Sequence, residues 1–276
     1  MTVFRSSKLV VNACGLTVLL SLSAFPQKQV DGLISTARSQ MVNGRLAECQ
    51  RTLDTILAAN PRDTTALKLK ADAHYLAGQD AEAERALSKA IAIEPRDLEL
   101  RYALGRIYYQ QSRPEAAAGQ FQEVLKLNPA SYKAYDNLGL CYQALRRDSE
   151  AIAAFLKALD LVHEAHREYE WPYANLASFL IDRGDYERAF ELAAEASARN
   201  PNSARNLYLT GKALVKLTKF DLSVRWLKRA TEVDPDYREA HYLLARAYRE
   251  LGRTEEEKLE LRRFQQIQAK TPQNHR

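Results

Sequence analysis

The chain has 276 residues, 46% of them hydrophobic and 27% charged, which is typical of a folded, soluble protein with one large domain or two ordinary ones. The formal net charge is +5, but Arg5 and Lys8 supply two of these charges within the first 24 residues, which hold no acid. The remaining +3 is too small for a concentrated basic stripe, so we expect no nucleic-acid partner. Ala, Leu, Glu, Arg and Lys dominate the composition, and this mix favours helices.

Residues 1–26 have the pattern of a signal peptide or membrane anchor. A short basic stretch precedes an apolar run over residues 9–25, and the small residues Ser23 and Ala24 stand where a signal peptidase would cut. Polar residues such as Asn12 make this run a poor membrane span, which needs about 20 mostly apolar residues. We expect export to a bacterial periplasm or cell envelope. The alternative is a membrane-anchored protein that keeps its leader and touches the membrane only through it.

A period of 34 residues runs through the rest of the chain. Pro61, Pro95 and Pro129 are 34 residues apart, and so are Pro201 and Pro235. Counting back from these prolines gives seven blocks and a tail. The blocks are 30–63, 64–97, 98–131, 132–169, 170–203, 204–237 and 238–271, and the tail is 272–276.

The same places in each block hold the same kind of residue. The eighth place is small in all seven: Ala37, Ala71, Gly105, Gly139, Ala177, Gly211 and Ala245. The twentieth is small in six: Cys49, Ala83, Ala117, Ala151, Ala189 and Ser223. The twenty-fourth is apolar throughout: Leu53, Leu87, Phe121, Phe155, Ala193, Leu227 and Leu261. Each block therefore reads as a helix–turn–helix pair in which small residues allow close approach, and which must stack on its neighbours to bury its apolar face.

This pattern resembles the tetratricopeptide repeat, most clearly over residues 98–129 and 132–161, and in all over roughly residues 30–271. The resemblance implies an all-α fold, a right-handed superhelical solenoid of antiparallel helix hairpins that binds protein or peptide. Lys70 and Thr210 replace the usual leucine, and Arg101 replaces an aromatic residue or leucine. Glu257 replaces alanine in the last block, which suits a terminal helix over which nothing stacks.

The fourth block breaks the pattern, because His163 stands where proline is expected and the next block starts four residues late. Four residues make about one helical turn. We therefore predict a second helix that is one turn longer and ends before Trp171, with Pro172 in the first turn of the next helix. On this interpretation His163 and His166 share an exposed face. The alternative is a metal-dependent enzyme at these two histidines, which would need further ligands.

The sequence contains no motif that supports catalysis of its own. It has no glycine-rich phosphate loop, no CxxC and no GxSxG, and nothing assembles into nucleophile, base and orienting group. We therefore expect no enzyme and no cofactor. Cys49 and Cys141 lie three blocks apart, too far for a disulfide, and are expected to be small buried residues. His241 falls at a packing place and is expected to be partly buried.

A candidate binding face follows from the block numbering. Places 5, 9 and 12 lie beside the buried stripe, and in proteins that this chain resembles they line the concave side of the superhelix and bind peptide. The residues at these places that we expect to contact a partner are Arg38, Lys68, Tyr75, Tyr102, Arg106, Tyr109, Tyr208, Lys212, Tyr242 and Arg246. Aromatic residues and arginine are common interface anchors. Basic residues outnumber acids on this face, so we expect a partner segment that is acidic or ends in a carboxylate.

Asparagines at the sixth place add a finer possibility from the same resemblance. Asn137 and Asn175 would be two rungs of a ladder whose amides both donate to and accept from a peptide backbone. A carboxylate clamp is incomplete, because only Asn137 is available for it. The alternative for each asparagine is an ordinary exposed side chain, and for the tyrosines it is half-buried helix packing. The expected function is a passive interaction scaffold of the cell envelope that assists assembly or secretion.

Overall fold

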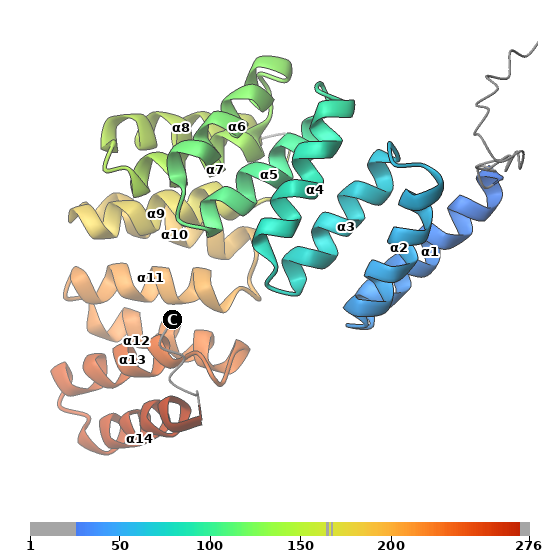
Figure 1. The fold of residues 1–276 in the computed structure, drawn as a ribbon. Coiled ribbons are helices and arrows are strands. Elements are labelled where there is room, and N and C mark those ends of the chain that lie inside the picture. Colours follow the sequence, from blue (N-terminus) through green and yellow to red (C-terminus); the bar gives the residue numbers. More distant parts are fainter. Residues whose placement is uncertain (1–25, 164–165, 167, 271–276) are drawn as a thin grey trace, which may run out of the picture. The chain divides into compact units, whose positions relative to one another are not determined.

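The computed structural model describes residues 26–163, 166 and 168–270, and these contain fourteen α-helices and no strand (Figure 1). The helices are α1 Gln27–Val42, α2 Leu46–Ala59, α3 Thr64–Leu76, α4 Asp80–Ile93, α5 Leu98–Gln110, α6 Pro114–Leu127, α7 Tyr132–Ala144, α8 Asp148–Val162, α9 Trp171–Arg183, α10 Tyr186–Arg199, α11 Ala204–Lys216, α12 Phe220–Val233, α13 Arg238–Glu250 and α14 Thr254–Lys270. Unit 1 contains α1–α4 and ends at Pro95, and unit 2 contains α5–α14 and begins at Arg96. The predicted all-α fold is confirmed.

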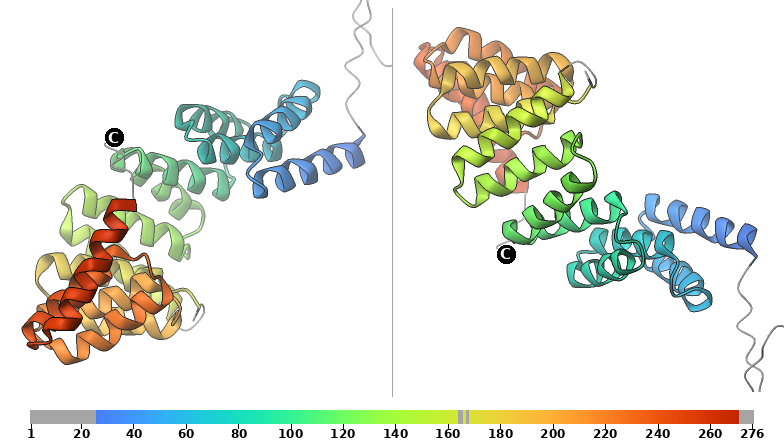
Figure 2. Two further views of the ribbon diagram at one scale, coloured as in Figure 1. Left: turned by 90° about the horizontal axis from the view of Figure 1, so that it is seen from below. Right: turned by 90° about the horizontal axis from the view of Figure 1, so that it is seen from above.

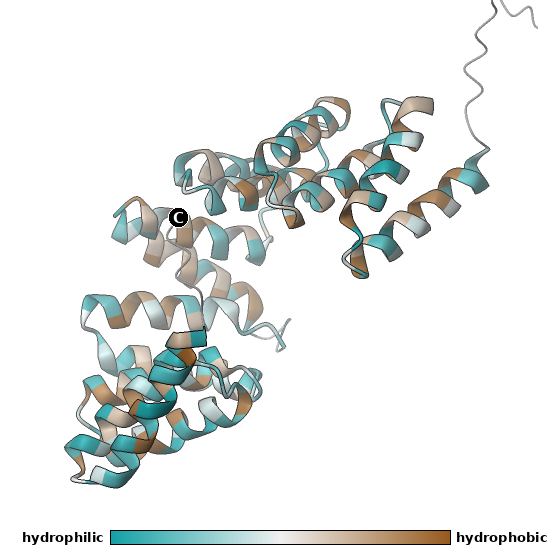
Figure 3. Ribbon diagram, turned by 60° about the horizontal axis from the view of Figure 1, so that its bottom comes forward, coloured by the Kyte–Doolittle hydropathy of each residue, from teal (hydrophilic) through white to brown (hydrophobic). Residues whose placement is uncertain are grey.

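Each unit is a stack of antiparallel hairpins. Every odd-numbered helix packs on the even-numbered helix that follows it, and within unit 2 the first helices α5, α7, α9, α11 and α13 also contact one another in order (Figures 1 and 2). The helices are amphipathic, with apolar and polar residues interspersed along each (Figure 3). In the part of the chain that is described, no helix has the length and apolar character needed to cross a membrane. Because α5, α7, α9, α11 and α13 contact one another in order, they form one layer of unit 2. We call the side chains at places 5, 9, 12 and 13 of these five helices the first-helix face.

Small residues at the eighth place are required by direct contact within each hairpin. A Cβ atom on Gly139 would lie 2.6 Å from two ring carbons of Phe155, which is closer than real Cβ atoms approach any neighbour. The same relation joins Gly105 to Phe121 of the preceding hairpin, at 2.8 Å. Both phenylalanines are fully buried, so their rings have no room to move. Places 8 and 24 therefore form one packing pair in each of these hairpins.

The short segment around the recurring proline ends one helix and starts the next. Asn128 follows α6 in an extended conformation, which the next residue, Pro129, favours. Its side-chain oxygen accepts the backbone N–H of Ala130 at 3.1 Å, and the Ser131 hydroxyl then accepts the N–H of Ala134 and caps α7. The equivalent caps elsewhere are Asp63, Asp97 and Ser203. The Asn128 and Ser131 side chains thus satisfy one backbone N–H in the turn and one in the first turn of α7.

The predicted extra helical turn at the end of the fourth block is wrong. α8 ends at Val162 and has 15 residues, only one more than α6, and residues 168–170 lie outside any helix. Side chains of this linker pack on α7 instead, because the ring of Tyr132 lies 4.5 Å from that of His166 and 4.8 Å from that of Tyr169, measured between centroids. The start of α9 is as predicted, with Pro172 in its first turn.

Candidate partner-binding face

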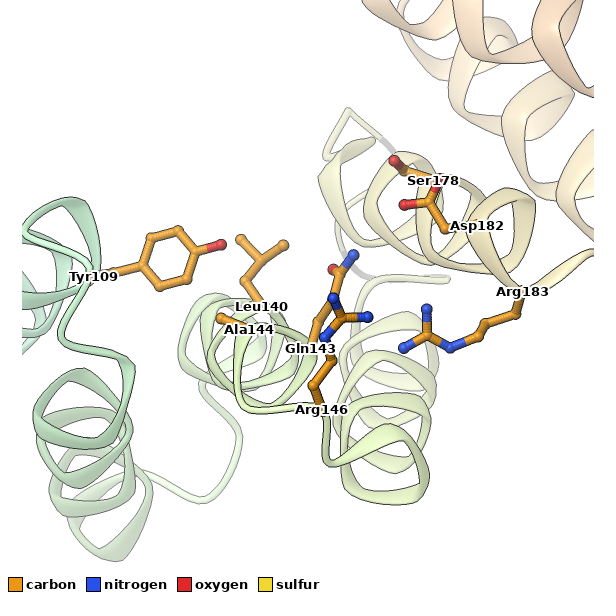
Figure 4. A pocket seen from close by; sticks show the side chains of 8 residues that line it. All are labelled: Tyr109, Leu140, Gln143, Ala144, Arg146, Ser178, Asp182 and Arg183. Carbon is orange, nitrogen blue, oxygen red and sulfur yellow. The ribbon is translucent and has the colours of Figure 1, made fainter. Parts of the chain in front are cut away.

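The first-helix face contains a hollow of about 640 Å³ over α5, α7 and α9 (Figure 4). We call it the central hollow; its lining residues are Tyr109, Leu140, Gln143, Ala144, Arg146, Ser178, Asp182 and Arg183. All except Arg146 and Arg183 stand at places 9, 12 or 13 of their blocks. Burial raises the pKa of the half-buried Tyr109, so its hydroxyl stays neutral and able to donate a hydrogen bond. Three consecutive repeats thus shape one concavity from equivalent places.

A second hollow of about 450 Å³ lies over α11, α13 and α14. This C-terminal hollow is lined by Tyr208, Arg238, Glu239, Tyr242, Leu243, Phe264 and Gln268. The ring of Tyr242 is half exposed and packs 5.5 Å from that of Phe264. Three of these seven residues are aromatic and Leu243 is apolar, so the hollow offers a surface for an apolar side chain. Two predicted contact residues, Tyr208 and Tyr242, therefore come together here.

The other predicted contact residues of unit 2 differ in their solvent exposure and in their internal partners. Arg106 and Arg246 are exposed. The Lys212 ammonium lies 3.8 Å from an Asp182 carboxylate oxygen, so its charge is partly matched within the face. Tyr102 is half-buried, and its hydroxyl accepts a hydrogen bond from the Asn137 amide at 2.9 Å. The two arginines are the cations that remain most accessible to a partner.

Unit 1 carries three of the predicted residues. Arg38 is exposed on α1, while Lys68 and Tyr75 are half-buried on α3. They lie on the first helices of their hairpins, as the block numbering requires.

Asn175 does not have the exposed amide that the predicted ladder requires. The residue is only 5% exposed, its amide nitrogen donates to Asp136 at 2.9 Å, and its oxygen accepts from Arg205 at 2.9 Å. The expectation that Asn175 faces a peptide is therefore wrong, because internal partners use both sides of the amide. Asp136 is itself 2% exposed, and burial raises the pKa of its carboxyl to about 6 although Asn175 and Arg205 oppose the shift.

The linker between α8 and α9 packs near the buried Asn175–Asp136 pair. Tyr169 packs on the Tyr132 ring, and burial, followed by the charge of Asp136, raises the pKa of its hydroxyl. Glu170 is also buried and accepts a hydrogen bond from Asn200 at 2.9 Å. The linker therefore covers the amino-terminal ends of α7 and α9.

The two histidines do not share an exposed helix face, contrary to the prediction. His166 packs on the Tyr132 ring, and His163 lies beyond the end of α8 with its Nδ1 3.3 Å from the Tyr173 hydroxyl. The described residues include no group of three or more His, Cys, Asp or Glu side chains placed to hold a metal ion. Cys49 and Cys141 are both buried and free, as expected. His241 is also buried, with its Nδ1 2.5 Å from a Glu260 carboxylate oxygen.

Of the eight lining residues, Tyr109 was among the predicted contact residues. Arg146 and Arg183 lie outside places 5, 9, 12 and 13, because Arg183 is the last residue of α9 and Arg146 lies in the turn after α7. A signal for Arg146 is nevertheless visible in the sequence. Its place in the block is glycine in four other blocks: Gly44, Gly78, Gly184 and Gly252. All four glycines, and Arg146 as well, have φ between +59° and +86°. Ser112 and Thr218 hold the same place in the two remaining blocks, at φ +56° and +58°, so Arg146 is one of three non-glycine residues in this conformation.

Known family models match most of the chain. A tetratricopeptide repeat family model matches residues 35–97, 102–166 and 208–274, and a second tetratricopeptide repeat model matches residues 173–208. No curated protein matches the chain.

Several solved structures share the fold. One comes from a functional characterization of Pseudomonas aeruginosa pilF, and is 20% identical with a TM-score of 0.65, covering 80% of this chain and 98% of that one. PilW, a widely conserved type IV pilus biogenesis factor, is 18% identical with a TM-score of 0.67 and coverages of 78% and 97%. A tetratricopeptide repeat protein from Parabacteroides merdae is 14% identical with a TM-score of 0.68 and coverages of 89% and 95%. Since the family models span most of its length and its helices form the same superhelical repeat, the chain belongs to the tetratricopeptide repeat family.

Proposed function

We propose that this protein is an interaction scaffold that binds a segment of a partner protein on the first-helix face of unit 2. The observation that carries the proposal is the central hollow, in which three consecutive repeats contribute equivalent places to one concavity. Its wall combines the Tyr109 ring and the Leu140 side chain with the polar groups of Gln143 and Ser178. A preformed surface of this kind binds without a large ordering cost.

The partner segment is proposed to carry negative charge. Arg106 and Arg246 are exposed on the same face, and Arg146 and Arg183 border the central hollow. Complementary charge increases the rate of encounter and disfavours basic partners. An acidic segment or a terminal carboxylate meets this requirement.

The cellular role is proposed to be that of an accessory factor for assembly or secretion in the cell envelope. This part rests on residues 1–26, whose basic and apolar stretches have the pattern of an export signal and which lie almost entirely outside the described residues. The amino-terminal residue of the protein purified from its native host tests it, because cleavage near Ala24 distinguishes export from retention as an anchor.

Filling the central hollow tests the binding face. Ser178→Trp places a large side chain in the hollow, and Ser149→Trp places the same side chain at an exposed position of α8 that does not line it. In crosslinking from native envelope extract, we expect a partner captured by the unmodified chain and by Ser149→Trp to be lost with Ser178→Trp. Charge reversal by Arg106→Glu with Lys212→Glu should weaken the same capture. Equal capture by all of these chains, at unchanged helical content, would refute the proposed face.

A further inference from the structure

Arg146 occupies a position that backbone conformation alone would give to glycine. It lies in the turn after α7 with φ +59°, a left-handed conformation in which a Cβ atom is unfavourable. The equivalent turn of the preceding repeat has Ser112 at φ +56°, but that residue does not line either hollow described above. Thr218 has the same conformation in the block 204–237, at φ +58°, so three blocks place a side chain at this turn. Of these three residues, Arg146 is the one that lines the central hollow.

Arg146 and Arg183 face the same space. Figure 4 shows their guanidinium groups extending into the gap between the ends of α7 and α9, with Gln143 beside them. Arg183 already donates to both carboxylate oxygens of Asp148, at 2.7 and 2.5 Å. That hydrogen bonding, with smaller contributions from the charges of Arg183 and Arg146, lowers the pKa of Asp148. The Asp148 carboxylate is thus ion-paired with Arg183 and not with Arg146.

The remaining acid of the central hollow, Asp182, lies 3.8 Å from the Lys212 ammonium. Among the described residues no carboxylate lies within ion-pairing distance of Arg146. The border of the hollow thus has one cation in excess, with its planar donors directed into open space. A guanidinium in this arrangement suits a carboxylate, which it can bind through two parallel hydrogen bonds.

We propose that Arg146 is a specificity residue that binds an internal Asp or Glu side chain of a partner segment lying across α5, α7 and α9. The inference rests on the proposed function and names one contact within it. α7 is the middle of the three helices, so Arg146 stands beside the middle of the path, where a bound segment presents side chains and not its terminus. Tyr109 and Leu140 provide the apolar wall for the residue next to the acidic one.

The test uses synthetic arrays of N-acetylated, C-amidated dodecapeptides of random sequence, printed as pairs that differ only by Glu or Gln. The chain and its Ser112→Gly variant are expected to prefer the Glu member by about fivefold at low ionic strength. Arg146→Gly and Arg146→Gln should lose this preference. Arg146→Gly should not lower the thermal midpoint, because glycine suits the turn, and Ser112→Gly is the matched control for that substitution.

Each outcome bears on a different step. Peptides that bind equally as Glu and Gln, or a preference that persists in Arg146→Gln, would overturn the assignment of Arg146 and leave the binding face intact. Binding only to a second array with free carboxyl termini would overturn the internal side chain in favour of a terminal carboxylate. Absence of any peptide whose binding Ser178→Trp abolishes would count against both this inference and the proposed function.

Discussion

Replacing Gly139 by alanine tests the close approach of the two helices in a repeat. The added Cβ would lie 2.6 Å from ring carbons of Phe155, and this ring is fully buried. Overpacking of this kind costs about 1–3 kcal/mol, whereas alanine in place of glycine inside a helix gains about 0.5–1 kcal/mol. The steric cost is the larger, so we expect Gly139→Ala to lower the free energy of unfolding by about 1 kcal/mol.

Gly119→Ala is the matched control. Gly119 lies inside α6, and a Cβ there would meet nothing within 4 Å, so only the helix gain of about 0.5–1 kcal/mol applies. Urea denaturation followed by circular dichroism should therefore move the two midpoints in opposite directions. Adding Phe155→Leu to Gly139→Ala recreates the alanine–leucine pair of another hairpin, and its loss should be smaller than the sum of the single losses. Shifts of the same sign for both glycine variants would refute the contact argument.

Three further predictions concern buried polar groups and thiols. Folding raises the pKa of Asp136 from 3.8 to about 6, so protonation of this carboxyl stabilises the folded state. The stabilisation is present below about pH 4 and is lost as pH rises through 6. In urea titrations, the wild type should therefore lose about 1 kcal/mol of stability relative to Asp136→Asn between pH 5 and 7. Glu260→Ala leaves the buried His241 ring without its carboxylate partner, at a cost of about 1–3 kcal/mol, and hydrogen exchange should accelerate more in α14 than in α11. Burial raises the pKa of the Cys141 thiol to about 12, so iodoacetamide at pH 8 should modify it only after unfolding, as located by mass spectrometry.

The sequence was sufficient to predict the repeat and its packing places, because both follow from local periodicity. Pairs such as Gly139 and Phe155 lie within one hairpin, so counting along the chain identifies them. Counting failed at the linker after α8, where four extra residues suggested another turn of helix. Tyr169 packs there on Tyr132 of α7, and a contact between residues so far apart in sequence leaves no periodic signal. Arg146 was missed for another reason: it lies in the turn after α7, and helix-face rules do not cover turns.

The predicted contact residues of α5, α7 and α9 separate into two groups. Residues at places 5 and 6 near the amino-terminal ends of α5, α7 and α9 form internal contacts: Tyr102 bonds to Asn137, and Asn175 bonds to Asp136. Residues at places 9, 12 and 13, toward the carboxyl ends of the same helices, line the open central hollow.

Tyr169 from the linker lies beside the first group and not beside the second. If a partner segment crosses these three repeats as proposed, we expect it to follow the half of the face that ends at Arg146. Since the closed half buries an ionisable carboxyl at Asp136, substitutions there should act mainly on folding, whereas substitutions around the hollow should act on binding. Under the proposed function, recognition would therefore use the open half of this face and not the half beside the broken repeat.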